Sequence, residues 1–198
     1  MEAIEKIKEL AALAVPGALV EIVNSTPAAQ QPALLVDRDH VYAVGRFLKE
    51  DPRFQTDFCS CVTGVDYLPK ADKPGFIEVV YHLYSVAQKQ GPIILKVRAP
   101  RELDQCRVPS LTPLWRGAEF QEREAYDLYG VKFDGHPDLR RILMWDEFTD
   151  HPMRKDYVPP ADYEWEPTPH DDTLERTVQA GGITPPTAIE EFQKAKKK

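Results

Sequence analysis

Cysteine is scarce in this sequence, which has three cysteines in 198 residues. Cys59, Cys61 and Cys106 do not form a disulfide framework, and no Cys-x-x-Cys pair is present. This scarcity argues against an iron–sulfur cluster held by this chain alone. Cys59 and Cys61 are two residues apart in a predicted strand, so we expect both thiols on one face of it, half-buried and reduced.

The short motifs that mark most catalytic sites are also missing. The sequence has no glycine-rich phosphate loop, no His-Glu-x-x-His and no nucleophile elbow. His136, Glu147 and His151 are conceivable metal ligands because the last two are four residues apart, but no comparable ligand set surrounds them. We therefore predict no catalytic, cofactor-binding or metal-binding residue in this chain.

Long apolar runs and an excess of positive charge are absent as well. No run approaches the roughly 20 residues that a membrane-spanning helix requires. A net charge of −7 and a pI near 5.3 argue against nucleic acid as the main ligand. The stretch Met1–Glu5 has neither signal-peptide nor transit-peptide character, so we expect a cytoplasmic protein.

What the sequence does contain is a clear order of periodic segments. Their order predicts an α+β fold with two layers, in which helices cover one face of a mixed sheet of about five strands. Residues 1–134 form the predicted core domain, and residues 135–198 form a predicted extended, Pro-rich, acidic tail. The expected helices are 2–14, a helix capped by Asp37 or Asp39 and ending at 49, and 113–129; the expected strands are 18–23, 33–36, 58–68, 76–86 and 92–97.

The predicted helix 113–129 carries unusually many charges. Thr112 is the expected N-cap and Gly130 the expected stop. Glu122 falls in the apolar row of this helix, where a carboxylate is costly to bury unless donors or cations meet it. Arg123 is expected on the opposite side, within ion-pairing reach of Glu119 and Asp127. Glu122 and Glu124 point about 200° apart on a helix, so they cannot act as a catalytic pair.

The composition of the sequence changes after Gly130. Eight of the 18 prolines lie at or beyond Pro137, and residues 156–175 contain seven acidic residues and no lysine or arginine. Three large aromatics are interleaved with these acids, which favours an extended tail docked on a partner over a disordered one. Two His-Pro steps, at His136 and His151, are each followed by an apolar residue and two adjacent bases. These basic residues could neutralise the acidic residues of the helix or face a partner, and the sequence does not distinguish between the two roles.

The central stretch resembles a known family, the C subunit of proton-pumping NADH-quinone oxidoreductase, which is the 30 kDa subunit of respiratory complex I. The resemblance is dense from Trp115 to Pro159, and it departs at Asp150, where a glycine is expected. Asp tolerates a left-handed backbone better than most residues, so the turn can survive there. The residues that carry the resemblance, called the signature residues below, are Glu122, Arg123, Glu124, Asp127, Tyr129, His136, Arg140, Arg141, Arg154 and Lys155.

The resemblance implies a non-catalytic structural subunit of the peripheral arm. It implies no cofactor in this chain, with FMN and iron–sulfur clusters in partner subunits, and electron transfer from NADH to quinone coupled to proton translocation. It implies partnership chiefly with the D subunit, with the B and I subunits nearby, and a place on the cytoplasmic side of the bacterial inner membrane, held there only through the complex. The signature residues are then expected to lock the fold and contact partners.

Three other hypotheses remain open at this point. The chain could be the equivalent subunit of a ferredoxin-fed relative or of a membrane-bound hydrogenase. It could also be a free-standing acidic binding module, or, least favoured, an independent enzyme. The electron donor binds elsewhere in such complexes, so one sequence cannot separate the first of these from complex I.

Overall fold

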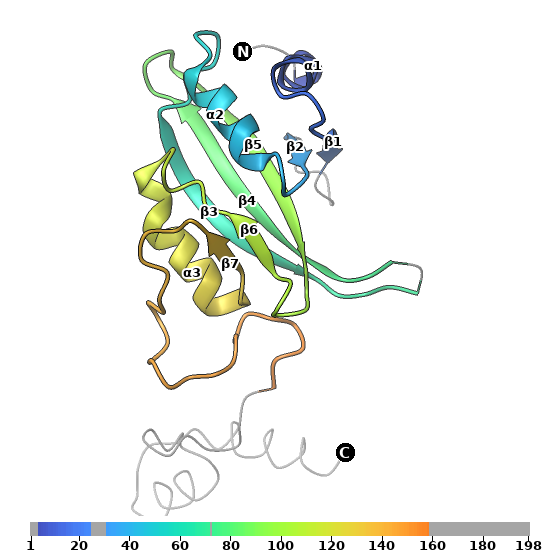
Figure 1. The fold of residues 1–198 in the computed structure, drawn as a ribbon, viewed down its shortest axis with the longest axis vertical. Coiled ribbons are helices and arrows are strands. Elements are labelled where there is room, and N and C mark those ends of the chain that lie inside the picture. Colours follow the sequence, from blue (N-terminus) through green and yellow to red (C-terminus); the bar gives the residue numbers. More distant parts are fainter. Residues whose placement is uncertain (1–3, 25–30, 72, 159–198) are drawn as a thin grey trace, which may run out of the picture. The chain divides into compact units, whose positions relative to one another are not determined.

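The computed structural model of the protein describes residues 4–24, 31–71 and 73–158 (Figure 1). Five strands form the main sheet in the order β1-β2-β5-β4-β3. The pair β2–β5 is parallel and the other three pairs are antiparallel, so the predicted mixed sheet is confirmed. The strands are β1 (Val20–Asn24), β2 (Pro32–Val36), β3 (Phe58–Tyr67), β4 (Phe76–Ser85) and β5 (Gln90–Pro100).

Three α-helices pack on one face of this sheet, and with it they form the predicted α+β, two-layer arrangement (Figure 1). They are α1 (Ile4–Ala14), α2 (Val41–Glu50) and α3 (Glu119–Tyr129). The inward side chains of the sheet alternate with outward ones, as in Ile77, Val79 and Tyr81 of β4, and they join the helix side chains in one hydrophobic core. Burial of this shared apolar surface is what holds the two layers together.

Two short strands complete the fold and were not predicted. In the sequence, β6 (Arg107–Pro109) precedes α3 and β7 (Lys132–Asp134) follows it. The two strands pair in parallel with each other. Each is three residues long, too short to show a period of two. Their pairing brings the segment before α3 next to the segment after it.

The starts of helices α2 and α3 differ from the prediction. α2 has His40 at its N-cap without a side-chain cap, because the Asp37 carboxylate instead accepts hydrogen bonds from the Leu19 amide and from His40. α3 begins at Glu119, after a 3-10 turn (Arg116–Ala118), and not at Pro113. Thr112 has another role, described below.

The Cys59–Cys61 prediction is wrong about the shared face. A bulge lies between the two residues, so Cys59 pairs with Leu83 while Cys61 pairs with His82, its chain neighbour. Leu83 belongs to the core face, and His82 therefore to the opposite face. Cys59 is buried, and burial raises the pKa of its thiol to about 12.

The described part of the chain up to Tyr157 forms one compact unit. The predicted end of the core domain at residue 134 stays a prediction, and the segment 135–157 is hydrogen-bonded to α3 and to Asp66 of β3. The remainder of the predicted tail, 159–198, lies outside the described residues. No helix in the described part of the chain is long and apolar enough to cross a membrane.

Candidate functional site

The signature residues gather around α3, and one of the two that are fully buried is Glu122, whose exposed fraction is 0%. Its carboxylate accepts hydrogen bonds from the Ser110 hydroxyl (2.5 Å), the Leu111 amide (2.8 Å), the Thr112 hydroxyl (3.1 Å) and the Tyr81 hydroxyl (3.1 Å). Four donors from β4 and the chain before α3 therefore replace the water that burial removes. Burial raises the pKa of Glu122, and the donors oppose that rise without cancelling it.

Arg123 is buried, and the ion pairs expected with Glu119 and Asp127 are replaced by other contacts. Its guanidinium donates to the carbonyl oxygens of Arg140 (3.2 Å) and Arg141 (3.0 Å). Asp127 does not pair with it, and the nearest carboxylate oxygen in an ion pair is that of Asp138, at 3.8 Å. The chain after β7 folds back over this side of α3, which a helical-wheel argument cannot foresee.

Asp127 is the second fully buried acid of the signature, and it organises the loop that covers α3. One oxygen accepts the backbone amides of Ile142 (3.0 Å), Leu143 (2.7 Å) and Met144 (2.8 Å). The other oxygen bonds Arg141 at 2.6 Å. Burial alone would raise the pKa of Asp127, but these donors outweigh it and hold the pKa below its ordinary value.

The C-terminal end of α3 is closed by residues of the second His-Pro step. Its last carbonyl groups accept hydrogen bonds from the His151 ring (2.8 Å), the Met153 amide (3.1 Å) and the Arg154 guanidinium (3.0 Å). A cationic group at this end also suits the helix dipole. Burial lowers the pKa of His151, so the ring is held neutral here, with Nδ1 as the donor.

Asp66 of β3 ties the same segment to the sheet. Its carboxylate forms a two-point ion pair with Arg101 (2.7 and 2.9 Å) and accepts the Lys155 amide (2.8 Å). Arg101 also bonds Asp156, and Arg154 donates to the Arg101 carbonyl. Burial opposes ionisation of Asp66, but Arg101 and the amide keep its pKa below the ordinary value.

The remaining signature side chains divide into bound and exposed ones. The His136 ring bonds the Glu119 carbonyl oxygen, and Arg140 pairs with Asp138. The Tyr129 ring lies against Gly64 of β3, where an added Cβ would come within 2.6 Å of it. In contrast, the side chains of Glu124 and Lys155 are exposed and form no hydrogen bond or ion pair within the described residues.

Other sites considered from the sequence are not assembled by the fold. Glu122 is buried and Glu124 exposed, so they do not share a site. Among the described residues, no group of three or more His, Cys, Asp and Glu side chains is placed to hold a metal ion. Asp150 lacks the left-handed backbone considered for it, and its carbonyl oxygen accepts a hydrogen bond from Arg141.

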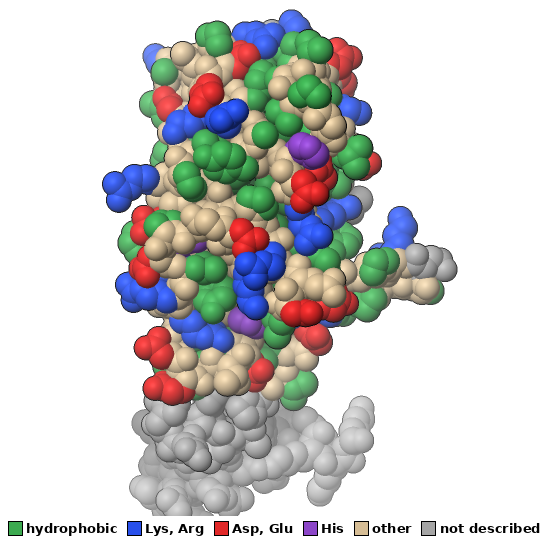
Figure 2. Space-filling model, viewed as in Figure 1, with side chains coloured by type: hydrophobic (Ala, Val, Ile, Leu, Met, Phe, Trp, Pro, Cys, Tyr) green, Lys and Arg blue, Asp and Glu red, His purple; other side chains and the backbone are tan. Residues whose placement is uncertain are grey.

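A surface cleft of about 250 Å³ lies beside the end of α3. Its walls carry both signs of charge and two rings, and sequence reasoning did not anticipate it because its residues come from two distant segments. They are Leu103, Asp150, His151, Arg154, Asp156 and Tyr157. The face of the molecule in Figure 2 likewise mixes positive, negative and apolar side chains without a large field of one sign.

Gly130 is expected to be essential for closing this end of α3. It has φ +77°, and an added Cβ would lie 2.6 Å from Leu103 and 2.7 Å from the His151 ring. Gly130→Ala is therefore expected to lower the free energy of unfolding by about 3 kcal/mol, combining roughly 1–2 kcal/mol of backbone strain with steric overlap. Gly135→Ala is the matched control, since Gly135 has φ +82° but no atom near the added Cβ, and only the strain remains. Equal losses in urea unfolding of the two variants would contradict this account.

With this geometry established, the chain can be placed in a family. It matches the family of the respiratory-chain NADH dehydrogenase 30 kDa subunit over residues 34–163, and it belongs to that family. This range contains all ten signature residues. The resemblance noted from the sequence is therefore confirmed.

Individual relatives agree with this placement. The C 2 subunit of NADH-quinone oxidoreductase from Rhizobium meliloti is 44% identical over 126 residues, covering 63% of this chain and 65% of the relative. The C subunit from Moorella thermoacetica is 48% identical over 126 residues, covering 64% of this chain and 79% of the relative. The match to the C subunit from Saccharopolyspora erythraea spans only 47% of that relative's length. The chain therefore spans less than two thirds of the length of two of these three relatives.

A solved structure shows the same fold. It is a chain from the membrane-bound sulfane sulfur reductase, described as an archaeal respiratory membrane complex. The TM-score is 0.59 at 28% identity, and the match covers 79% of this chain and 86% of that chain.

Proposed function

We propose that this chain is a non-catalytic structural subunit of the peripheral arm of NADH-quinone oxidoreductase. In that complex, electrons pass from NADH through FMN and iron–sulfur clusters in other subunits to quinone, coupled to proton translocation. The neighbours are chiefly the D subunit, with the B and I subunits nearby, on the cytoplasmic side of the membrane. Attachment to the membrane is through the complex.

This proposal rests on the groups that the charged signature side chains bond. Arg123, Asp127 and Arg141 bond backbone groups of the chain or one another. Glu122 is enclosed by four donors. Groups held in this way position a chain; they do not face a substrate. This favours a scaffold role for the family signature in this chain.

Arg123→Ala tests the scaffold role directly. Removing this buried guanidinium leaves two carbonyl groups without their donor, which is expected to cost about 2–4 kcal/mol and to reduce the amount of assembled complex. Quinone reductase activity should fall in proportion to the complex recovered, while activity per assembled complex stays at the wild-type level. Arg107→Ala, which removes an exposed pair with Asp134, is the control. Full assembly with lost turnover would instead assign Arg123 a direct catalytic role.

A second candidate is the equivalent subunit of a related complex with another electron donor, which the likeness to the sulfane sulfur reductase chain favours. A tagged full chain, purified from membranes in mild detergent, separates the two. If the chain is part of complex I, subunits with bound flavin that oxidise NADH should co-purify with it, together with the absorbance of iron–sulfur clusters. Cluster-containing subunits without NADH oxidation would support the relative. Recovery of the chain alone would support a free-standing binding module.

A further inference from the structure

Helix α3 presents a row of side chains that the described chain leaves partly uncovered. Phe120, Glu124 and Leu128 follow one another at four-residue steps, so they lie along one side of the helix. Phe120 is 60% exposed, Glu124 is exposed and Leu128 is half-buried. The core-facing side of α3, with Glu122 and Ala125, points elsewhere.

The covering loop extends this row with two more apolar side chains. Asp127 gathers the amides of residues 142–144 to one oxygen, which holds the loop backbone inward. Leu143 is consequently 61% exposed, and Ile142 is exposed as well. The buried Arg123 connects the two parts, since its guanidinium lies 5.6 Å from the Phe120 ring centroid and bonds the Arg141 carbonyl oxygen. We call Phe120, Glu124, Leu128, Ile142 and Leu143 the α3 stripe.

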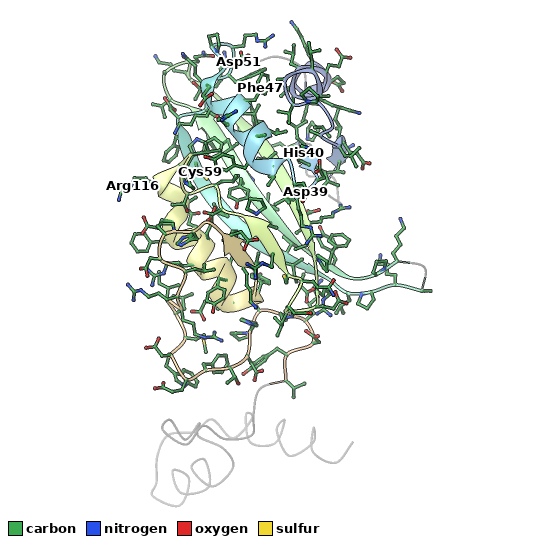
Figure 3. The ribbon with its side chains drawn as sticks, in the orientation of Figure 1. Asp39, His40, Phe47, Asp51, Cys59 and Arg116 are labelled. Atoms are coloured by element: carbon green, nitrogen blue, oxygen red, sulfur yellow. The ribbon has the colours of Figure 1, made fainter. Side chains whose placement is uncertain are left out.

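The stripe is fixed in place before anything binds it. Its backbone is held by two buried charged groups, so docking would not require ordering of a mobile loop, which is a major cost of association. Phenylalanine and arginine side chains are enriched at the centres of interfaces. Arg116, four residues before Phe120, points outward (Figure 3). Asp138 pairs with Arg140 and also lies within 3.8 Å of the Arg123 guanidinium.

Charge indicates what kind of surface fits the stripe. Glu124 is the one acidic signature residue without a hydrogen bond or ion pair within the described chain, whereas Glu122 and Asp127 are fully bonded. A carboxylate beside apolar side chains is covered at low cost only when a cation meets it. A second copy of the chain would bring the two Glu124 carboxylates toward each other across a symmetric interface, which charge repulsion disfavours.

We propose that the α3 stripe is a docking surface for another subunit of the same redox complex, one that presents an apolar surface with a lysine or arginine opposite Glu124. This inference rests on the proposed function and adds to it the surface through which this chain is held. It also gives the signature a second role, because the buried charges hold the stripe in its binding conformation.

The test uses the tagged full chain expressed in cells that lack the untagged one, with the complex recovered from membranes. Glu124→Lys and Phe120→Asp are each expected to lower recovery of the cluster-containing subunits at least about tenfold, the effect of losing one interface hot spot. Glu9→Lys and Leu13→Asp are matched controls, because Glu9 and Leu13 are likewise exposed and four residues apart on α1. The controls should stay within about twofold of wild type, the scale of a surface change.

Thermal unfolding of each purified full chain separates docking from folding. Unchanged unfolding of the two stripe variants with lost recovery supports the proposal, and so does a photo-cross-link from position 120 to another subunit in the assembled wild-type complex. Recovery at the control level, or a loss that merely follows reduced stability, overturns it. A wild-type chain that recovers no cluster-containing subunit overturns the proposed function, and this inference with it.

Discussion

Replacing Asp127 with alanine is expected to lower the free energy of unfolding by about 3–5 kcal/mol, the usual cost of breaking a buried ion pair by removing one partner. The change leaves Arg141 and three backbone amides without their common acceptor. For a chain of this size the melting temperature should fall by roughly 6–20 °C. Calorimetry or urea unfolding of the purified full chain measures the loss.

Asp134→Ala is the matched control for Asp127→Ala. Asp134 also pairs with an arginine, Arg107, but both side chains are about half exposed, and such pairs contribute only about 0–1 kcal/mol. Similar losses in the two variants would show that Asp127 does not hold the loop as described.

The pH dependence of the free energy of unfolding provides a second test of the role of Asp127. Its pKa is lowered in the folded state, so its contribution is present above the ordinary value of 3.8 and is lost as the pH falls through the folded value. Asp66 behaves in the same sense. Asp127→Ala should therefore lose less stability than wild type on acidification below about pH 4. Parallel acid profiles would contradict this assignment.

Two substitutions of Glu122, to alanine and to glutamine, are expected to separate the effect of its charge from that of its hydrogen bonds. Glu122→Ala removes the acceptor of four donors and leaves a cavity, which should cost about 3–5 kcal/mol. Glu122→Gln should stay within about 1 kcal/mol of wild type at neutral pH, because its carbonyl can keep the Leu111 amide while the Ser110 and Thr112 hydroxyls rotate to accept from its amide nitrogen. Equal losses in the two variants would refute this.

The pH dependence of Glu122 has the opposite sign to that of Asp127. Burial raises its folded-state pKa, so its contribution is fully present below the ordinary value of 4.5 and is lost as the pH rises through the folded value. Glu122→Gln lacks this loss. Its stability relative to wild type should therefore increase between about pH 4.5 and 7, as measured by urea unfolding across that range. A difference independent of pH would show that the carboxylate titrates normally.

Local patterns predicted the order of the main elements correctly. Periods of two and of three to four gave helix, two strands, helix, three strands, helix, and the observed elements follow this order. Gly130 was identified as the stop of the central helix, and it adopts the left-handed conformation expected there. These features depend on neighbours in the chain, which is why the sequence reveals them.

The errors have a common physical cause, since each depends on residues far away in the sequence. Arg123 was expected to pair with Glu119 and Asp127, because a helical wheel does not show the chain near Arg140 and Arg141, whose carbonyl oxygens it bonds instead. Thr112 was assigned to a helix cap, yet its hydroxyl bonds Glu122, ten residues later. The bulge between Cys59 and Cys61 shifts the register with β4 and sends the two thiols to opposite faces.

The sequence by itself determined the fold class, the charged character of the central helix and the family to which the chain belongs. Only the tertiary structure decided which charges are used internally and which remain outside. That division depends on which backbone amides and carbonyl groups come within hydrogen-bonding distance of each side chain, and folding of the segment 135–157 onto α3 sets those distances. Arg123 and Asp127 were thereby enclosed, Glu122 was enclosed by β4 and residues 110–112, and Glu124 was left facing outward.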